Sequence, residues 1–158
     1  MQATANNDVL FGGFESRSRK GYVEGSINGD MDTYVDTYDH TLPAEDWFAI
    51  TLSEPATIGR VVFTHGVTVY NGGWFDTSAG KPKVRVQLTK DGEWKTVGEL
   101  TDYPATTAAS AANLIAGTAF TCQLSAPMKV LGVRVVGKPA SGNNPAEAYS
   151  TCSKLQAF

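Results

Sequence analysis

Four aspartates gather near the N-terminus in a pattern that could hold a hard cation. They are Asp30, Asp32, Asp36 and Asp39, and the closely spaced Asp30 and Asp32 supply the oxygen ligands that calcium prefers. The stretch departs from the EF-hand loop, because Tyr34 stands where a further oxygen ligand is required and no glutamate closes the loop. From these residues alone, a solvated acidic loop and a calcium site both stay open.

Few residues of the chain suit catalysis. The only histidines are His40 and His65, and the sequence contains neither a Gly-x-Ser-x-Gly elbow nor a His-Glu-x-x-His pair. The two cysteines, Cys122 and Cys152, match no zinc motif. They form either one disulfide or two buried thiols, and we favour buried thiols. We therefore expect no enzymatic activity.

Size and charge exclude several other classes of protein. The 158 residues fit one domain, 1–158, and the 13 Lys and Arg against 16 Asp and Glu give a net charge of −3. Nucleic acid is not an expected partner, because phosphate binding needs clustered positive charge. No apolar stretch is long enough to span a bilayer, and Asn6, Asn7 and Asp8 do not suit a signal peptide. The protein is expected either to stay inside the cell or to have lost its signal.

The elements that would position functional residues are predicted to be β-strands. Short apolar or alternating runs, separated by loops rich in Gly, Asn and Asp, predict strands at 47–52, 58–64, 84–89, 94–97, 118–124, 130–136 and 155–158. Val84, Val86 and Leu88 are expected on one face of the third strand, and a tight turn at Asp91-Gly92 should follow it. The segment 108–116 is interpreted as a loop within a long crossover. The whole pattern predicts an all-β, antiparallel β-sandwich whose loops carry the function.

Several segments, taken in order, resemble one known family. They are Trp47–Leu52, Ile58–Phe63, Asn71–Phe75, Lys83–Leu88, Lys90–Trp94, Val130–Pro139 and Tyr149–Phe158. Their order and spacing resemble the coagulation factor 5/8 type C (discoidin) family, which includes the bacterial family 32 carbohydrate-binding modules. The resemblance implies a jelly-roll sandwich of the galactose-binding-domain type with a sugar site in the loops at one end. It also implies an extracellular parent enzyme or surface protein from which this module comes.

The same resemblance bears on calcium. The family commonly holds a structural calcium in an Asp-rich loop, and the matching positions here are Asn28, Asp30, Asp32 and Thr33. The family's glutamate ligand in the last strand is replaced by Lys154. We therefore expect either a calcium bound with fewer acidic ligands or the Lys154 ammonium in the place of the ion.

The resemblance also places three loops at one end of the sandwich. A sugar site needs an aromatic face for the apolar side of a pyranose and short polar groups for its hydroxyls. The candidate carbohydrate-binding residues are Asp36, Tyr38, His40, His65, Tyr70, Asn71, Trp74, Phe75, Asn143 and Asn144. Alternatives stay open for several of them: Trp74 as a core residue, His65 as a structural histidine, and Asn143 and Asn144 as turn residues. Trp47 and Trp94 are assigned to the sandwich itself.

The resulting hypothesis is a monomeric, non-catalytic carbohydrate-binding module. It would need no cofactor for chemistry, would bind a mono- or oligosaccharide, and would be linked covalently to a catalytic domain in a secreted parent. Galactose-type glycans are the first expected ligands because the resemblance favours them. The alternative is a discoidin-like adhesion module that binds protein or a membrane surface through Tyr70, Trp74 and Phe75. The charge of the loops favours sugar binding over lipid binding, because lipid-binding loops normally carry basic residues. The loops here carry Asp36, Asp39 and Asp76 against the single Lys81.

Overall fold

The computed structural model describes residues 11–17 and 34–158. The predicted calcium ligands Asn28, Asp30, Asp32 and Thr33 lie outside these residues. Within the described residues, eight strands make up the regular structure: β1 (Phe11–Ser16), β2 (Val35–Asp36), β3 (Asp46–His65), β4 (Phe75–Asp76), β5 (Lys83–Gln87), β6 (Trp94–Glu99), β7 (Ala119–Pro139) and β8 (Thr151–Ala157). All pairs of strands are antiparallel. The predicted all-β, antiparallel sandwich is confirmed.

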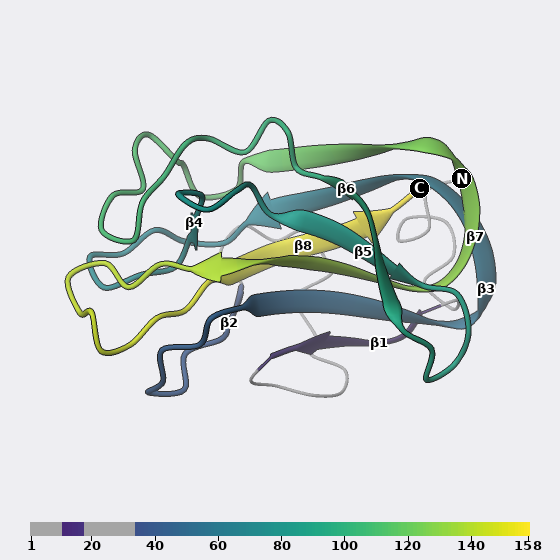
Figure 1. Cartoon of the computed structure of the whole chain (residues 1–158), viewed down its shortest axis with the longest axis horizontal. Coiled ribbons are helices and arrows are strands. Elements are labelled where there is room, and N and C mark those ends of the chain that lie inside the picture. The colour runs from purple at the N-terminus through teal and green to yellow at the C-terminus, as the bar shows by residue number, and fades with distance from the viewer. Residues whose placement is uncertain (1–10, 18–33) are drawn as a thin grey trace.

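Two long strands, β3 and β7, connect the two layers of the sandwich. In the first region where β3 pairs with β7, β3 also pairs with β1 and β7 also pairs with β5, and β6 lies at the edge beyond β5. In the second region, β3 also pairs with β8, and β2 lies at the edge beyond β8. The register between β3 and β7 shifts between Thr51 and Ala56 and between Ile58 and Arg60. Both strands bend together in this region, at the right-hand end of the molecule in Figure 1. One continuous pair of strands therefore contributes to both layers.

A row of aromatic rings forms the centre of the core. Ring centroids lie 4.8–6.4 Å apart along the series Phe14, Phe48, Phe63, Phe75, Tyr103 and Phe120. Each of these side chains is at most 5% exposed. Since such pairs add packing energy beyond their buried area, the row joins strands of both layers to the long loop that carries Tyr103. Burial raises the pKa of the Tyr103 hydroxyl, which accepts a hydrogen bond from the backbone of Phe75 at 2.9 Å.

Each predicted strand overlaps a strand of the structure, but the predicted strands 47–52 and 58–64 are both parts of β3, and 118–124 and 130–136 both belong to β7. Val84 and Val86 are fully buried, but Leu88, which was expected on the same face of the strand, lies beyond the end of β5 and is 40% exposed. The predicted hairpin is present, with a longer loop than a two-residue turn. Asp91 takes the left-handed conformation with φ 59°, and the backbone of Gly92 donates to the Thr89 carbonyl at 3.0 Å. The segment 108–116 is a loop, as interpreted from the sequence.

Two tryptophans of the sandwich lie outside the core. Trp47 alternates with the buried Phe48 along β3 and is half-buried, as is Trp94 on β6. The guanidinium of Arg134 on β7 lies between them, 3.8 Å from the Trp47 ring and 4.2 Å from the Trp94 ring. Cation–π contacts of this kind stabilise partly desolvated surfaces. The two tryptophans therefore support the outer side of one layer rather than filling the interior.

Both cysteines are free and buried in the structure. Cys122 lies on β7 and Cys152 on β8. Burial raises the pKa of both thiols, which keeps them protonated and unreactive. The preference for buried thiols over a disulfide is confirmed.

Candidate functional site

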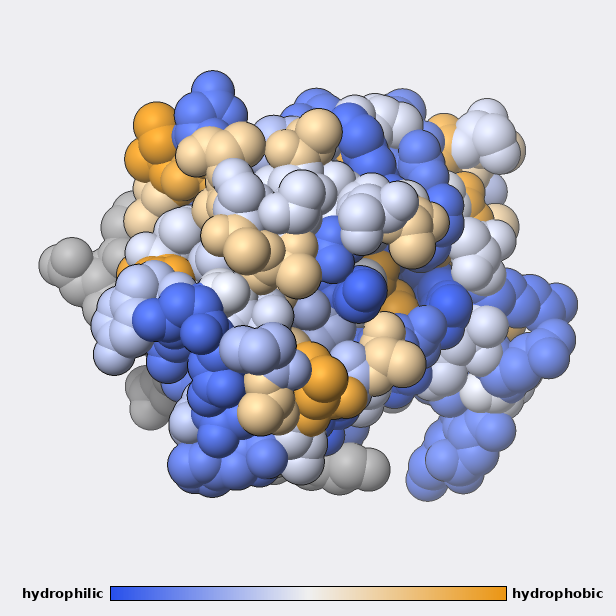
Figure 2. All heavy atoms as spheres, turned by 60° about the vertical axis from the view of Figure 1, so that its left-hand side comes forward, coloured by the Kyte–Doolittle hydropathy of each residue, from blue (hydrophilic) through white to orange (hydrophobic). Residues whose placement is uncertain are grey.

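Three loops that are far apart in the sequence meet at one end of the sandwich. The backbone of Asn143 donates to the Tyr70 carbonyl at 2.9 Å, and that of Gly73 donates to the Tyr149 carbonyl at 3.1 Å. The backbone of Ala148 donates to the Thr41 carbonyl at 2.9 Å. Segments 37–45, 66–74 and 140–150 are thus held together at the left-hand end of Figure 1, opposite the bends of β3 and β7. Figure 2 shows this end as a mainly polar surface with scattered apolar residues.

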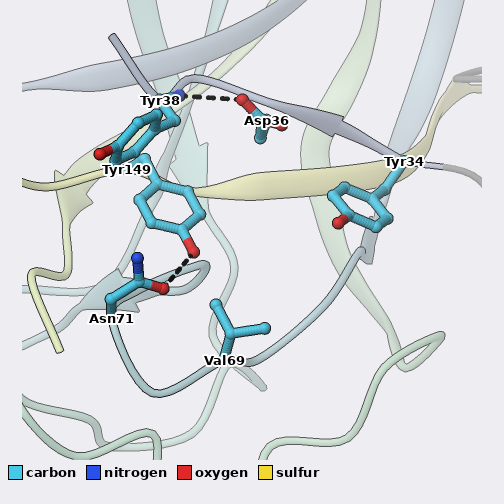
Figure 3. Close-up of a pocket in the computed structure, with 6 residues that line it drawn as sticks. All are labelled: Tyr34, Asp36, Tyr38, Val69, Asn71 and Tyr149. Atoms are coloured by element: carbon cyan, nitrogen blue, oxygen red, sulfur yellow. Dashed lines mark hydrogen bonds between the residues drawn. The ribbon is translucent and has the colours of Figure 1, made fainter. Parts of the chain in front are cut away.

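A pocket of about 320 Å³ opens between these loops. Its lining residues, all labelled in Figure 3, are Tyr34, Asp36, Tyr38, Val69, Asn71 and Tyr149. Three are tyrosines, two are short polar residues and one is apolar. The composition combines aromatic rings with hydroxyl, amide and carboxylate groups, which is the combination expected of a site for a hydroxylated ring.

Strand β2 positions one wall of the pocket. Tyr34, Asp36 and Tyr38 are two residues apart in extended chain, so their side chains fall on the same side. Asp36 Oδ1 accepts a hydrogen bond from the backbone of Tyr38 at 3.1 Å, which fixes the carboxylate at the end of the strand. Tyr34 is 46% exposed, so part of its ring is accessible.

Tyr149 forms the base of the pocket against the 66–74 loop. Its hydroxyl donates to Asn71 Oδ1 at 2.9 Å (Figure 3), and its ring makes an edge contact with Tyr38 at 5.3 Å. The loop can come this close because Gly72 has φ 139° and no side chain: a Cβ there would lie 2.7 Å from the Tyr149 ring. With its oxygen engaged by Tyr149, Asn71 presents its amide nitrogen as a donor.

Glu147 and His40 extend the pocket at its rim. The Tyr38 hydroxyl donates to Glu147 Oε2 at 2.5 Å, and this hydrogen bond is the main cause that raises the pKa of Tyr38. His40 Nδ1 lies 3.5 Å from Glu147 Oε1, and the His40 ring makes an edge contact with the Tyr38 ring at 4.7 Å. His40 adopts a left-handed backbone with φ 63°, which turns the chain at the tip of this loop.

Arg17 and two carboxylates form a partly buried network that holds the 37–45 loop from behind. Arg17 donates through Nε to Asp46 Oδ1 at 2.9 Å and through Nη1 to Asp39 Oδ2 at 2.6 Å. The hydroxyls of Thr37 and Ser150 also donate to the Asp46 carboxylate, which is fully buried. Because Thr37 lies between Asp36 and Tyr38, this network fixes the backbone that carries both pocket residues.

The structure brings together only some of the predicted binding residues. Asp36, Tyr38 and Asn71 line the pocket, and His40 lies at its rim. Tyr70, beside Asn71, is 78% exposed. Asn143 and Asn144 lie in the next loop, where Asn144 accepts a hydrogen bond from the backbone of Ala146 at 3.2 Å, as turn residues do.

Three predicted residues are buried away from the surface. Phe75 is 1% exposed within the aromatic row, and Trp74 is 3% exposed with Nε1 donating to the Thr107 carbonyl at 2.8 Å. His65 is fully buried, with Nε2 2.7 Å from the Thr68 hydroxyl. The structure therefore supports the alternative in which Trp74 is a core residue and the alternative in which His65 is a structural histidine. None of the three side chains reaches the pocket, because each packs into the interior of the sandwich.

The sequence interpretation did not include Tyr34, Val69, Tyr149 or Glu147 among the binding residues. The spacing of Tyr34 from Asp36 and Tyr38 could have indicated Tyr34 as a pocket residue, since alternate residues of a strand share a face. Tyr149 begins the segment Tyr149–Phe158, which carries part of the family resemblance. Its position beneath Gly72 depends on contacts between distant loops, which no local pattern contains.

The Tyr149 hydroxyl in the pocket stays protonated. Burial first, then Asp36 and the hydroxyls of Tyr34, Tyr38 and Tyr70, raise the pKa of Tyr149 to about 12. Its proton therefore remains available for the hydrogen bond that it donates to Asn71 Oδ1.

Metal binding finds no support in the part of the chain that the structure describes. No group of three or more His, Cys, Asp and Glu side chains gathers there in a way that could hold an ion. Lys154 lies half-buried on β8, paired with Thr64 of β3. Calcium at Asn28, Asp30, Asp32 and Thr33 stays a prediction, as does its replacement by Lys154. Among residues 11–17 and 34–158, no helix is long and apolar enough to cross a membrane.

Comparison with solved structures identifies the class of fold. The chain superposes on the module CpGH89CBM32-5 of Clostridium perfringens, solved with GalNAc-β-1,3-galactose, over 92% of this chain and 93% of that one (TM-score 0.60, 14% identity). The family 32 module of NanJ from the same organism, solved with galactose, matches over 91% and 90% (TM-score 0.60, 13% identity). The family 32 module of AlyQ, solved with 4,5-unsaturated mannuronic acid, matches over 94% and 95% (TM-score 0.59, 11% identity).

These likenesses establish that the chain has the β-sandwich fold of the family 32 carbohydrate-binding modules, the discoidin-like fold that its sequence resembles. No protein-family model matches the sequence, and no curated protein is similar enough to count as a match. At these identities the likeness concerns the fold, and the function has to be argued from the pocket.

Proposed function

We propose that this protein is a non-catalytic carbohydrate-binding module that uses the pocket at the loop end of the sandwich. The observation that carries the proposal is the pocket's lining of three tyrosines, a carboxylate and an amide within about 320 Å³. Structural neighbours of the same fold were solved with galactose, GalNAc-β-1,3-galactose and an unsaturated mannuronic acid. Galactose-type sugars are the first ligands to test.

Binding rests on two kinds of contact. The partly exposed ring of Tyr34 offers an apolar face to the C–H groups of a pyranose. Asp36 accepts hydrogen bonds from sugar hydroxyls, and the Asn71 amide and the Tyr149 hydroxyl orient the ring. A pocket of this size holds one or two sugar units.

Such a module would act by holding its parent protein close to the glycan. A shallow site gives modest affinity, because little surface is buried against the entropy of association. Linkage to a catalytic domain or surface protein turns weak binding into a high effective concentration at the glycan. We propose that this chain serves a secreted parent protein in that way.

A glycan array followed by calorimetric titration of the hits tests the site. Tyr34→Ala should lower the affinity about two- to tenfold, since stacking contributes roughly 0.5–1.5 kcal/mol, and Asn71→Ala should lower it similarly. Asn113→Ala is the matched control, because Asn113 is exposed in the loop 100–118 and lies outside the pocket. Wild-type protein that binds no glycan would reject the function. Glycan binding that neither pocket variant weakens would reject the site.

Exposed apolar side chains keep a second candidate function in consideration. Leu42 is 58% exposed and Tyr70 is 78% exposed, and both belong to the loops of the pocket end. A discoidin-like adhesion module would insert such residues into a membrane or a protein partner. Co-sedimentation with vesicles of neutral and anionic lipid separates the two functions. Vesicle binding that Leu42→Ser and Tyr70→Ser abolish, without glycan binding, would favour adhesion.

A further inference from the structure

The 66–74 loop supplies one wall of the pocket. Val69 and Asn71 line the pocket from this loop (Figure 3). At the tip of the loop, the backbone amides of Val69 and Gly72 each donate to the carbonyl of the other, at 3.0 and 3.2 Å. A compact surface loop whose ends lie close together is positioned by the contacts at those ends. These contacts therefore decide where the two pocket residues lie.

A single hydroxyl joins the two ends of this loop. Thr151 Oγ1 on β8 accepts the backbone N–H of Val67 at 2.8 Å and donates to the Gly73 carbonyl at 2.8 Å. The Val67 carbonyl, 3.1 Å from the same oxygen, is a second acceptor. A hydroxyl has one proton to donate and lone pairs to accept with, and Thr151 uses both capacities on the loop. Since Val67 stands near the start of the loop and Gly73 near its end, one side chain holds both.

The Thr151 side chain is enclosed beneath the loop. It is 1% exposed. A Cβ on Gly66 would lie 2.7 Å from Thr151 Oγ1 and 2.9 Å from the Cβ of Tyr34, so the loop can begin this close to both residues only with glycine there. Without the hydroxyl, backbone groups at both ends of the loop would lose their partner next to the protein interior, which costs free energy.

Thr151 also connects to the other walls of the pocket. In the pairing of β2 with β8 it lies opposite Asp36. Tyr149 precedes it by two residues, and the Tyr149 carbonyl accepts the backbone N–H of Gly73 at 3.1 Å. Strand β2, the 66–74 loop and the base of the pocket thus all meet beside this one residue.

From this arrangement we propose that Thr151 is the positioning residue of the sugar pocket. Its hydroxyl holds the 66–74 loop in the binding conformation, and so places Val69 and Asn71, while Thr151 itself lies outside the pocket lining. A loop already held in that conformation loses little conformational entropy when a sugar binds, which raises the affinity. This role rests on the proposed function and adds the residue that pre-organises its site.

Four variants test this role. Thr151→Val lacks the hydroxyl but keeps a similar shape, and Thr151→Ala lacks it without adding a methyl group that has to fit. Thr151→Ser keeps the hydroxyl. Thr106→Val is the matched control, because Thr106 is 5% exposed and lies outside the pocket. Its hydroxyl likewise accepts a backbone N–H, that of Thr77 at 3.2 Å, and donates to a carbonyl, that of Phe75.

Amide hydrogen exchange measures the position of the loop without any sugar. The Val67 amide, which donates to Thr151 Oγ1, should be protected in the wild-type protein. It should exchange about tenfold faster in Thr151→Val and Thr151→Ala, because the acceptor is lost. In Thr151→Ser its rate should stay within about threefold of wild type. Thr106→Val should leave the rate unchanged.

Calorimetric titration with galactose, and with the tightest-binding glycan of the array, measures the effect on the pocket. Thr151→Val and Thr151→Ala should bind about tenfold more weakly than wild type, whereas Thr151→Ser should stay within about threefold. Urea unfolding of the same proteins separates affinity from stability. Thr106→Val should lose stability and keep its affinity.

Each outcome either supports or overturns the inference. Full affinity in Thr151→Val and Thr151→Ala, or a loss that Thr151→Ser shares, would overturn it and leave the carbohydrate-binding function in place. An equal loss of affinity in Thr106→Val would show that stability, rather than the position of the loop, is responsible. If the wild-type protein binds no glycan, the proposed function falls and the role of Thr151 in binding falls with it, whatever the exchange rates show.

Discussion

His65 shows how a residue chosen for its chemistry can act through its burial. The imidazole is fully buried, and Nδ1 has no hydrogen-bond partner among the described residues. Burial lowers the pKa of His65 from 6.5 to about 4. The folded protein therefore holds this side chain neutral, and a proton placed on it would be a charge without a partner.

This burial predicts a pH dependence of stability. Between pH 6.5 and 4 the unfolded chain binds a proton at His65 that the folded chain does not, so the free energy of unfolding decreases as the pH falls through this range. The loss between pH 7 and pH 5 should be about 2 kcal/mol. Urea unfolding of wild type and of His65→Gln at both pH values measures it. His65→Gln should show a smaller loss, and an equal loss in both proteins would contradict the assignment.

At the scale of the elements, the pocket depends on how closely its loops approach one another. Two glycines show this, because Gly72 and Gly80 have similar left-handed backbones, with φ of 139° and 134°. A Cβ on Gly72 would lie 2.7 Å from the Tyr149 ring, whereas a Cβ on Gly80 would meet nothing within 4 Å. Alanine variants of these two glycines therefore distinguish the effect of backbone strain from the effect of displacing Tyr149 in the pocket.

We therefore predict different effects on binding for the two alanine variants. Both should lose about 1–3 kcal/mol of stability, because alanine is strained at a positive φ. Only Gly72→Ala should also weaken sugar binding, about tenfold, because Tyr149 must move. Urea unfolding and calorimetric titration of both variants measure the two effects. An equal loss of affinity in Gly80→Ala would show that strain, rather than contact with Tyr149, is responsible.

The strands were the most predictable elements, and the reason lies in their alternation. Val84 and Val86 alternate with half-buried polar residues, and this local pattern is enough to place them inside. The predicted strands at 47–52 and 58–64 are instead parts of the single strand β3. The exposed polar residues Ser53 and Glu54 separate them in sequence, yet the chain continues along β7 through the bend.

The site was less predictable because it is made by contacts between loops. Asp36, Tyr38 and Asn71 could be chosen by residue type and by the resemblance. The burial of Trp74 and Phe75 could not be read locally, since it depends on the loop that places Tyr103 and Thr107 against them. Two adjacent aromatics where a loop meets a short strand look the same in a sequence whether they face solvent or the core.

For the molecule as a whole, β3 and β7 make the two layers a single folding unit. Their 20 and 21 residues contribute to both layers, and the aromatic row connects the layers through the core. Neither layer can lose its central strands without disrupting the other. The chain should therefore unfold without a populated half-folded state.

Differential scanning calorimetry measures this cooperativity. The calorimetric and van't Hoff enthalpies should agree, and a single transition should be seen. Hydrogen exchange gives a residue-level check, in which the strongly protected amides of both layers should exchange with the same free energy of opening. Two transitions, or a lower protection of β8 and β2 than of β5 and β6, would show that the layers separate.

The position of Phe158 has a practical consequence for using this protein as a reagent. This residue ends the chain beside Gly59 and Arg60, where its carbonyl accepts the backbone N–H of Gly59 at 2.6 Å, and it lies at the end of the sandwich away from the pocket (Figure 1). A fluorophore, a biotin tag or a sensor chip attached at this carboxyl end would leave the sugar-facing loops pointing outward. Immobilisation in that orientation would suit the protein to staining cell surfaces or to displaying many copies on a bead.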